Sequence, residues 1–259
     1  GAERTSLDAR VVVGADGIRS IVARSLGVTR SAPFGGRVGL TFHLPDAAGA
    51  GPRDARMVLV RDGYIGIAPV PRDRVNVGIV LGASWRRRLR EHGAEHTCSE
   101  VIDRVPAADD DPAAWRTAAR SDPIAGAAPI AHRVARRSGP GWFLVGDAAG
   151  FLDPFTGEGI HRALISAELA ADSIQASLAP GASGAAERYD RAMRQRFLGK
   201  DRVSGLVQAF LGRPALFEYA ARRIASRDPV RETVGLVMGD LEPAERALDP
   251  RFLASLLAP

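Results

Sequence analysis

Hydrophobic residues change their spacing along the chain, and these changes predict where strands give way to helices. The chain opens with an apolar run over residues 7–13 that ends at Gly14, and apolar residues at helical spacing continue to Leu26. This order predicts a buried strand, a tight turn and a helix. Between residues 36 and 82 apolar residues alternate with small or polar ones, with a hairpin signal at residues 62–63. We therefore expect an antiparallel sheet in the middle of the chain.

The rest of the chain is predicted to be mainly helical. The expected elements that follow the sheet are a helix over 84–105, a loop over 107–112, an extended segment over 127–134 and a buried strand over 142–145. A helix then begins near Glu158 and ends at Pro180, and further helices follow from Ala185, interrupted before three prolines. The apolar face of the first of these helices is expected to consist of Ile160, Leu164, Ala167, Ala171, Ile174 and Leu178.

Composition narrows the class of protein. The chain has 259 residues, 46% hydrophobic and 25% charged, as is typical of a soluble globular protein. No apolar run is long enough to span a membrane and no signal peptide opens the chain. Cys98 is the single cysteine, so neither a disulfide framework nor a cysteine-based metal site is expected, and a cytoplasmic location is the natural interpretation.

The net charge of +5 raises the question of nucleic-acid binding, which the distribution of the basic residues does not favour. Lys200 is the only lysine, and the remaining basic residues are arginines. The densest arginine clusters, at residues 86–90 and 133–137, lack the interleaved aromatic residues of a single-strand platform. We expect no nucleic-acid partner; the basic surface leaves room for an anionic ligand or an anionic lipid surface.

Two segments combine a strand, a turn of small residues and a helix. In residues 11–20, Asp16 and Gly17 follow the strand, and a carboxylate there can accept hydrogen bonds from ribose hydroxyls. The alternative is that Asp16 caps the following helix by binding the N–H groups of Ile18 or Arg19. The residues alone leave both roles open.

The second segment, residues 142–164, delivers Asp147 to the end of a buried strand, directly after Gly146. Three small residues follow, and then Pro154, Gly157 and Gly159 shape a loop that opens a helix. The partial positive charge of a helix N-terminus stabilises negative charge on a bound ligand. The density of small residues favours a ligand site over a plain packing connection.

At these residues the chain resembles a known superfamily. The sequences GADGIRS and VGDAAGFLDPFTGEGI look like the paired Asp-Gly and Gly-Asp motifs of the aromatic-hydroxylase type of FAD-dependent oxidoreductase, closest to the geranylgeranyl reductase-like branch. The resemblance implies an α/β (α+β) fold, in which a Rossmann-like FAD-binding domain is interrupted by an antiparallel substrate-domain sheet. It assigns residues 1–30 and 127–180 to the FAD-binding domain, 31–126 to the substrate domain and 181–259 to a helical tail.

The same resemblance implies a set of flavin contacts. Asp147 would bind the ribityl or pyrophosphate side of FAD, Gly159 and Ile160 would contact the isoalloxazine through their backbones, and Asp16-Gly17 would help to hold FAD. The implied cofactor site also includes Gly146, Pro154 and Gly157. NAD(P)H or a partner would reduce the flavin. Superfamily members open with a Gly-x-Gly-x-x-Gly unit, which this sequence lacks; we expect it in the full-length protein, and expect this fragment alone to be inactive.

The residues expected to surround the substrate differ from those typical of each branch of the superfamily. Tyr64 and Pro69 are kept, but Gly66 and Ala68 stand where large rings are expected. The reaction therefore stays open: reduction of an unsaturated apolar substrate is favoured, hydroxylation of an aromatic or polyketide-like substrate comes second, and halogenation comes third. The alternative in which the protein is not an enzyme is a truncated, non-catalytic flavoprotein. No catalytic residue is identified; His161, His43 and Tyr64 are weak candidates.

The helical tail allows two interpretations. An apolar stripe over residues 203–220, with arginines around it, is expected either to pack on the parent domain or to wall a substrate tunnel and touch anionic lipid. Peripheral contact with a membrane therefore remains open.

Overall fold

The computed structural model describes residues 5–33, 36–45, 55–105, 123–179 and 183–257, and it divides into two compact units. One unit combines residues 1–31 with residues 132–259, and the other comprises residues 32–131. The predicted loop over 107–112 and the predicted helix end at Pro180 lie outside the described residues. The model is mixed α and β, in agreement with the predicted fold class.

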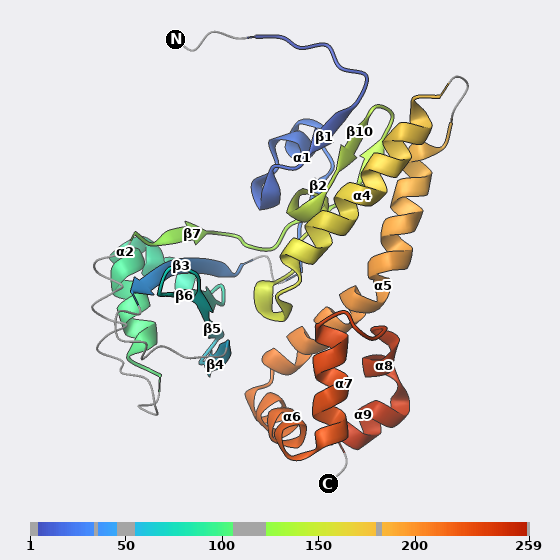
Figure 1. The fold of residues 1–259 in the computed structure, drawn as a ribbon. Helices are drawn as coiled ribbons and strands as arrows, with labels where there is room; N and C mark the ends of the chain where they lie inside the picture. The colour runs from blue at the N-terminus through green and yellow to red at the C-terminus, as the bar shows by residue number, and fades with distance from the viewer. Residues whose placement is uncertain (1–4, 34–35, 46–54, 106–122, 180–182, 258–259) are drawn as a thin grey trace. The chain divides into compact units, whose positions relative to one another are not determined.

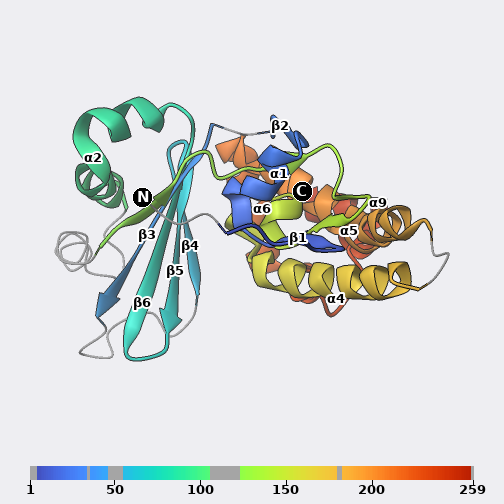
Figure 2. The ribbon, with the colours of Figure 1, turned by 90° about the horizontal axis from the view of Figure 1, so that it is seen from above.

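The unit of residues 32–131 is built on an antiparallel sheet with the strand order β4-β5-β6-β3-β7. Its strands are β3 (Val38–Pro45), β4 (Arg56–Val60), β5 (Gly63–Val70), β6 (Arg74–Leu81) and β7 (Ala125–Ala127). The predicted hairpin is confirmed: Val60 pairs with Gly63, and Asp62 takes a positive φ of 61° in the turn. Figure 2 shows the long strands side by side with helix α2 (Trp85–Ile102) next to them.

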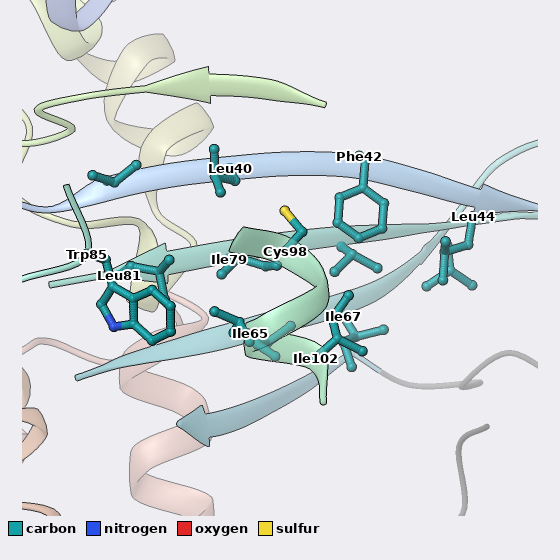
Figure 3. Packing of buried hydrophobic residues seen from close by; sticks show 14 residues of the cluster. Leu40, Phe42, Leu44, Ile65, Ile67, Ile79, Leu81, Trp85, Cys98 and Ile102 are labelled. Atoms are coloured by element: carbon teal, nitrogen blue, oxygen red, sulfur yellow. The ribbon is translucent and has the colours of Figure 1, made fainter. Parts of the chain in front are cut away.

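The core of this unit lies between the sheet and α2. Alternate residues of the strands point to one face, because successive side chains of a strand point to opposite faces. Trp85, Cys98 and Ile102 of α2 pack on that face (Figure 3). The strand residues of the same core include Val38, Leu40, Phe42, Leu44, Ile65, Ile67, Val75, Val77, Ile79 and Leu81. Gly93, with a φ of 79°, breaks the regular helical geometry within α2.

The other unit contains a three-stranded sheet in the order β1-β10-β9, formed by β1 (Val12–Gly14), β10 (Trp142–Leu144) and β9 (Ser138–Gly139). Strands β1 and β10 are parallel, with Val13 opposite Phe143. A second, two-stranded sheet joins β2 (Thr29–Arg30) to β8 (Arg133–Val134). The short helices of the two turns are η1 (Gly17–Arg19), α1 (Ile21–Ser25), η2 (Gly146–Ala149) and η3 (Pro154–Thr156).

Helices complete this unit (Figure 1). They are α4 (Gly159–Ser177), α5 (Ala185–Leu211), α6 (Pro214–Ser226), α7 (Asp228–Met238), α8 (Glu245–Leu248) and α9 (Pro250–Leu257). Pro214 and Pro229 lie in the first turn of α6 and α7, where the missing N–H of proline costs no hydrogen bond. The predicted breaks before the prolines are therefore confirmed.

Two expectations about burial are wrong. The run over residues 7–13 is not a buried strand: β1 begins only at Val12, and Val12 and Val13 are 47% and 44% exposed. The predicted apolar face of α4 points mainly to solvent, because Ile160 and Leu164 are 79% and 62% exposed. The buried positions of α4 are Ser166, Ala170 and Ser173. Small side chains there let α4 approach the turn after β10, which hydrophobicity alone does not reveal.

Candidate functional site

The two predicted turns come together because β1 and β10 are neighbouring parallel strands. Parallel strands end at the same edge of a sheet, so Asp16, two residues after β1, and Asp147, three residues after β10, both follow the carboxyl ends. Helices η1 and η2, which carry the two turns, are in contact. The expected strand–turn arrangement is thus confirmed. That both carboxylates face a common cleft stays a prediction.

Asp16 caps a helix, although not through the N–H groups expected. Its Oδ2 accepts hydrogen bonds from the backbone N–H of Ile21 (2.6 Å) and of Val22 (3.2 Å), at the start of α1. Burial opposes ionisation, but hydrogen bonds from Ser20, Val22 and Ile21 outweigh it and lower the pKa of Asp16. The residue is exposed, so this carboxylate is ionised at neutral pH and accessible to a ligand.

Asp147 lies in a different environment. It is half-buried, and among the described residues none donates a hydrogen bond to its carboxylate. Burial raises the pKa of Asp147, and the positive charges of Arg162 and His132 only partly oppose that effect. Burying a carboxylate that receives no hydrogen bond destabilises the folded state, so folding alone does not explain this residue. It is well suited to accept hydrogen bonds from the hydroxyl groups of a bound molecule.

The chain between Asp147 and α4 leaves its backbone accessible. Gly157 takes a left-handed φ of 70° that glycine adopts without strain, and a Cβ at Gly157 or Gly159 would meet no atom within 4 Å. Pro154 is exposed at the start of η3, and Ile160 is exposed in the first turn of α4. A planar ligand can therefore approach the N-terminus of α4 closely.

Gly146 has a structural role that the sequence did not indicate. A Cβ at this residue would lie 3.3 Å from the Cβ of Ala163, so glycine allows α4 to pack on the turn. The N–H of Gly146 donates to Oγ of Ser166 (2.8 Å), which is fully buried in α4. Gly17, with a φ of 75°, has open space on its Cβ side. A flavin contact at either glycine stays a prediction.

His161 belongs to a polar network, which we call the Lys200 network, formed by Glu158, His161, Arg196, Lys200 and Asp240. The ring Nε2 lies 2.9 Å from Oδ2 of Asp240 and 3.0 Å from Nη2 of Arg196. Hydrogen bonding by Arg196, together with Lys200, outweighs burial and lowers the pKa of Asp240. These contacts favour a structural role for His161.

Lys200 is the centre of this network. The residue is 6% exposed, and its Nζ contacts Oε1 of Glu158 (2.6 Å), the carbonyl of Val237 (2.6 Å) and Oδ1 of Asp240 (3.3 Å). It therefore ties the residue that precedes α4 to α7 and to the turn after α7. The sequence pattern does not indicate this role, although Lys200 stands out as the single lysine of an arginine-rich chain.

His43 and Tyr64 belong to the other unit. Both lie on the sheet face opposite the α2 core, where Thr41 Oγ1 donates to Oδ1 of Asn76 (3.0 Å). Tyr64 is buried and His43 is half-buried. The register places Gly66 opposite Gly78 on this face, so its centre carries no side chain beyond hydrogen. This face therefore combines polar side chains such as Thr41, His43 and Asn76 with a centre that carries no side chains.

The described part of the chain gives little support for a reactive thiol, a metal site or a membrane span. Burial raises the pKa of Cys98 to about 12, so this thiol is not a nucleophile at neutral pH. No three potential metal ligands among His, Cys, Asp and Glu gather within the described ranges. None of the helices in those ranges is both long and apolar enough to cross a membrane.

The arrangement fits the ribityl and isoalloxazine parts of FAD. An unpartnered carboxylate at Asp147, small buried residues at Ala148 and Ala149, and an accessible helix N-terminus at Gly159 follow one another along the chain. Asp16 supplies a second carboxylate at the same sheet edge. A bound flavin would supply the redox chemistry there.

Comparison with known proteins agrees with this geometry. The model of a family described as FAD binding domain matches residues 1–197. A digeranylgeranylglycerophospholipid reductase of Methanocella arvoryzae is 28% identical over 198 residues, which cover 74% of this chain and 47% of that protein. The chain spans about half the length of the curated relatives it matches.

Solved structures share the fold. The flavin-dependent brominase Bmp2 covers 89% of this chain and 57% of its own, with a TM-score of 0.67 and 18% identity. A protein described as a probable FAD-dependent monooxygenase from Pseudomonas aeruginosa covers 81% of this chain and 59% of its own, with a TM-score of 0.56 and 23% identity. The parallel strands, the two turns and the family match lead to one conclusion: the chain belongs to the FAD binding domain family of flavin-dependent oxidoreductases.

Proposed function

We propose that this protein is a reductase-like FAD-dependent oxidoreductase, in which reduced FAD transfers a hydride to an unsaturated apolar substrate. Asp147 carries the proposal, because its half-buried carboxylate receives no hydrogen bond from the described residues. It would accept hydrogen bonds from the ribityl hydroxyls, and the N-terminus of α4 would stabilise negative charge on the ring system. NAD(P)H is the proposed electron donor.

The two-domain assignment is part of the proposal. Residues 1–30 and 127–180 would hold FAD, residues 31–126 would hold the substrate and residues 181–259 would form a helical region. The digeranylgeranylglycerophospholipid reductases among the relatives favour an apolar substrate. The sheet face that carries Thr41, His43 and the glycine pair of Gly66 and Gly78 is the proposed substrate surface.

A further strand–helix unit would complete the flavin site. Among the described strands, β1 pairs with β10 on one edge only, and Val12 and Val13 are both exposed. Ile21, Ile160 and Leu164 add exposed apolar surface in the same unit. An unpaired strand edge next to exposed apolar side chains is the surface that an added strand and helix would cover.

The decisive experiment is titration of the full-length protein with FAD. Asp147→Ala should weaken FAD binding by about 10- to 100-fold, since a hydrogen bond to a charged group contributes about 1.5–3 kcal/mol. Asp172→Ala, at an exposed position of α4, is the matched control and should bind FAD normally. Unchanged affinity in Asp147→Ala would show that the carboxylate does not hold the cofactor. A flavin spectrum that never develops with added FAD would favour the non-catalytic alternative.

Hydroxylation is the second candidate, favoured by Gly66 and Ala68 on the proposed substrate face, which would leave room for an aromatic substrate. Halogenation comes third. The resemblance puts Glu158 near the position where halogenases hold a halide, and a carboxylate there would repel it. Lys200 pairs with Glu158 at 2.6 Å and offsets the repulsion. Product analysis with NADPH and either an unsaturated prenyl lipid or an aromatic acceptor separates these reactions.

A further inference from the structure

The helices beyond α4, together with η3, line an apolar cavity that is partly open to solvent and that the proposed flavin contacts do not use. Its volume is about 180 Å³, and its walls come from η3, α5, α6, α7, α8 and α9. Every lining residue is apolar, among them Phe155, Val207, Phe210, Phe217, Ala221 and Phe252. The wall has almost no polar atoms. An apolar pocket several times the volume of a water molecule, about 30 Å³, is a candidate binding site for an apolar group.

We propose that this cavity binds an uncharged hydrocarbon group, such as the end of a prenyl or acyl chain. A polar group placed inside would lose its hydrogen bonds to water and find no replacement, so the buried part of the ligand must be hydrocarbon. A cavity of about 150 Å³ lined by apolar residues is large enough for benzene. Drug-sized pockets begin at about 300 Å³, so only part of a larger molecule fits here.

The cavity adjoins the loop that leads to α4. Phe155 lines it, and the Phe155 ring meets the Phe217 ring edge-on, with centroids 6.0 Å apart and an interplanar angle of 87°. The N–H of Phe155 donates to Oδ1 of Asp153 (3.0 Å), which fixes the loop around the ring. Gly157 and Glu158 follow and lead into α4. A hydrocarbon in the cavity therefore contacts the same loop that precedes the proposed flavin-binding helix.

The test uses N-phenyl-1-naphthylamine, a neutral fluorescent probe, and its displacement by geraniol, with the full chain both with and without FAD. We expect the probe to bind and geraniol to displace it. Ala221→Phe places a ring in the cavity and should weaken probe binding by more than about tenfold. Ala225→Phe is the matched control, because Ala225 lies on the same helix, is exposed and does not line the cavity.

Probe binding that is equal in both variants, or absent from the unchanged protein, would overturn the proposal. If Ala221→Phe does not fold, Leu206→Phe fills the cavity from α5 instead. Vesicles of neutral phospholipid form a separate arm: displacement by geraniol but not by vesicles identifies a free hydrocarbon ligand, and displacement by both identifies a lipid chain. A protein that binds the probe but not FAD would contradict the proposed function and leave this inference standing.

Discussion

At the scale of single residues, the two aspartates at the sheet edge differ in what they contribute to folding. Asp16 satisfies the N-terminus of α1, and its pKa is lowered by these hydrogen bonds. Asp147 has no such donor among the described residues, and burial raises its pKa. A carboxyl group whose folded pKa is raised favours the protonated folded state, so its ionisation above the ordinary value near 4 reduces stability.

Asp147→Asn is therefore expected to raise the melting temperature at pH 7 while it weakens FAD binding. The stability difference from the unchanged protein should shrink as the pH falls through about 4 and should be small near about pH 3, where Asp147 is largely protonated in both the folded and unfolded states. Thermal unfolding without FAD between these pH values measures it. A variant that is less stable at pH 7 would show that the carboxylate supports the fold.

Replacing Lys200 is expected to destabilise the protein, in contrast to replacing Asp147. Lys200→Met would leave Glu158 and Asp240 without their shared cation, and should lower the free energy of unfolding by up to about 3–5 kcal/mol. Lys200→Met combined with Glu158→Gln should recover part of that loss, because one uncompensated charge is removed. Urea unfolding of the two variants tests this; a double variant no more stable than the single one would show that the Lys200–Glu158 pair is unimportant.

At the scale of elements, α4 buries small residues and exposes large ones. Ser166 is fully buried, accepts the N–H of Gly146 and donates to the carbonyl of Ala163. Leu164, two residues earlier, is 62% exposed. The packing of α4 against the turn after β10 therefore depends on close approach and one buried hydrogen bond rather than on the apolar stripe.

Two substitutions in α4 separate these contributions. Ser166→Val should lower the free energy of unfolding by about 1–3 kcal/mol, because it adds volume and leaves the N–H of Gly146 without its acceptor. Leu164→Ala should change it by no more than about 0.5 kcal/mol. Urea unfolding of both variants is the measurement. If Leu164→Ala is the more damaging change, the exposed stripe is covered in solution by another part of the protein.

At the scale of the whole molecule, the apolar stripe of the tail is turned inward. Val203, Leu206, Val207 and Phe210 line the cavity. This supports the packing role of the stripe and, in part, the idea of a hydrophobic wall. Contact with anionic lipid would then depend on exposed arginines such as Arg213 and Arg222, with the net charge of +5 in favour.

Any association with anionic vesicles should therefore be electrostatic. We expect co-sedimentation with phosphatidylserine vesicles at low salt, and loss of it at about 0.5 M salt, where charges are screened within a few ångströms. Neutral vesicles are the control and should leave the protein in the supernatant. If the protein also stays in the supernatant with anionic vesicles at low salt, peripheral membrane contact is wrong.

The order of elements and the two turns of the candidate site follow from local sequence features. The alternation between residues 36 and 82, the prolines at 214 and 229, and the glycines around Asp16 and Asp147 act locally, through side-chain direction and backbone freedom. These features predicted the antiparallel sheet, the helix boundaries and the carboxylates at the ends of two strands. The paired motifs also identified the superfamily.

Which polar groups find hydrogen-bond partners depends on long-range packing. That Asp16 is hydrogen-bonded and Asp147 is not depends on neighbours brought together by folding. The Lys200 network joins residues 158 and 240, and the cavity joins residues 155 and 252; periodicity carries no information over such separations. The exposed face of α4 was mispredicted for the same reason. Burial depends on which elements pack against a helix, whereas the hydrophobicity pattern along the chain describes only the helix itself.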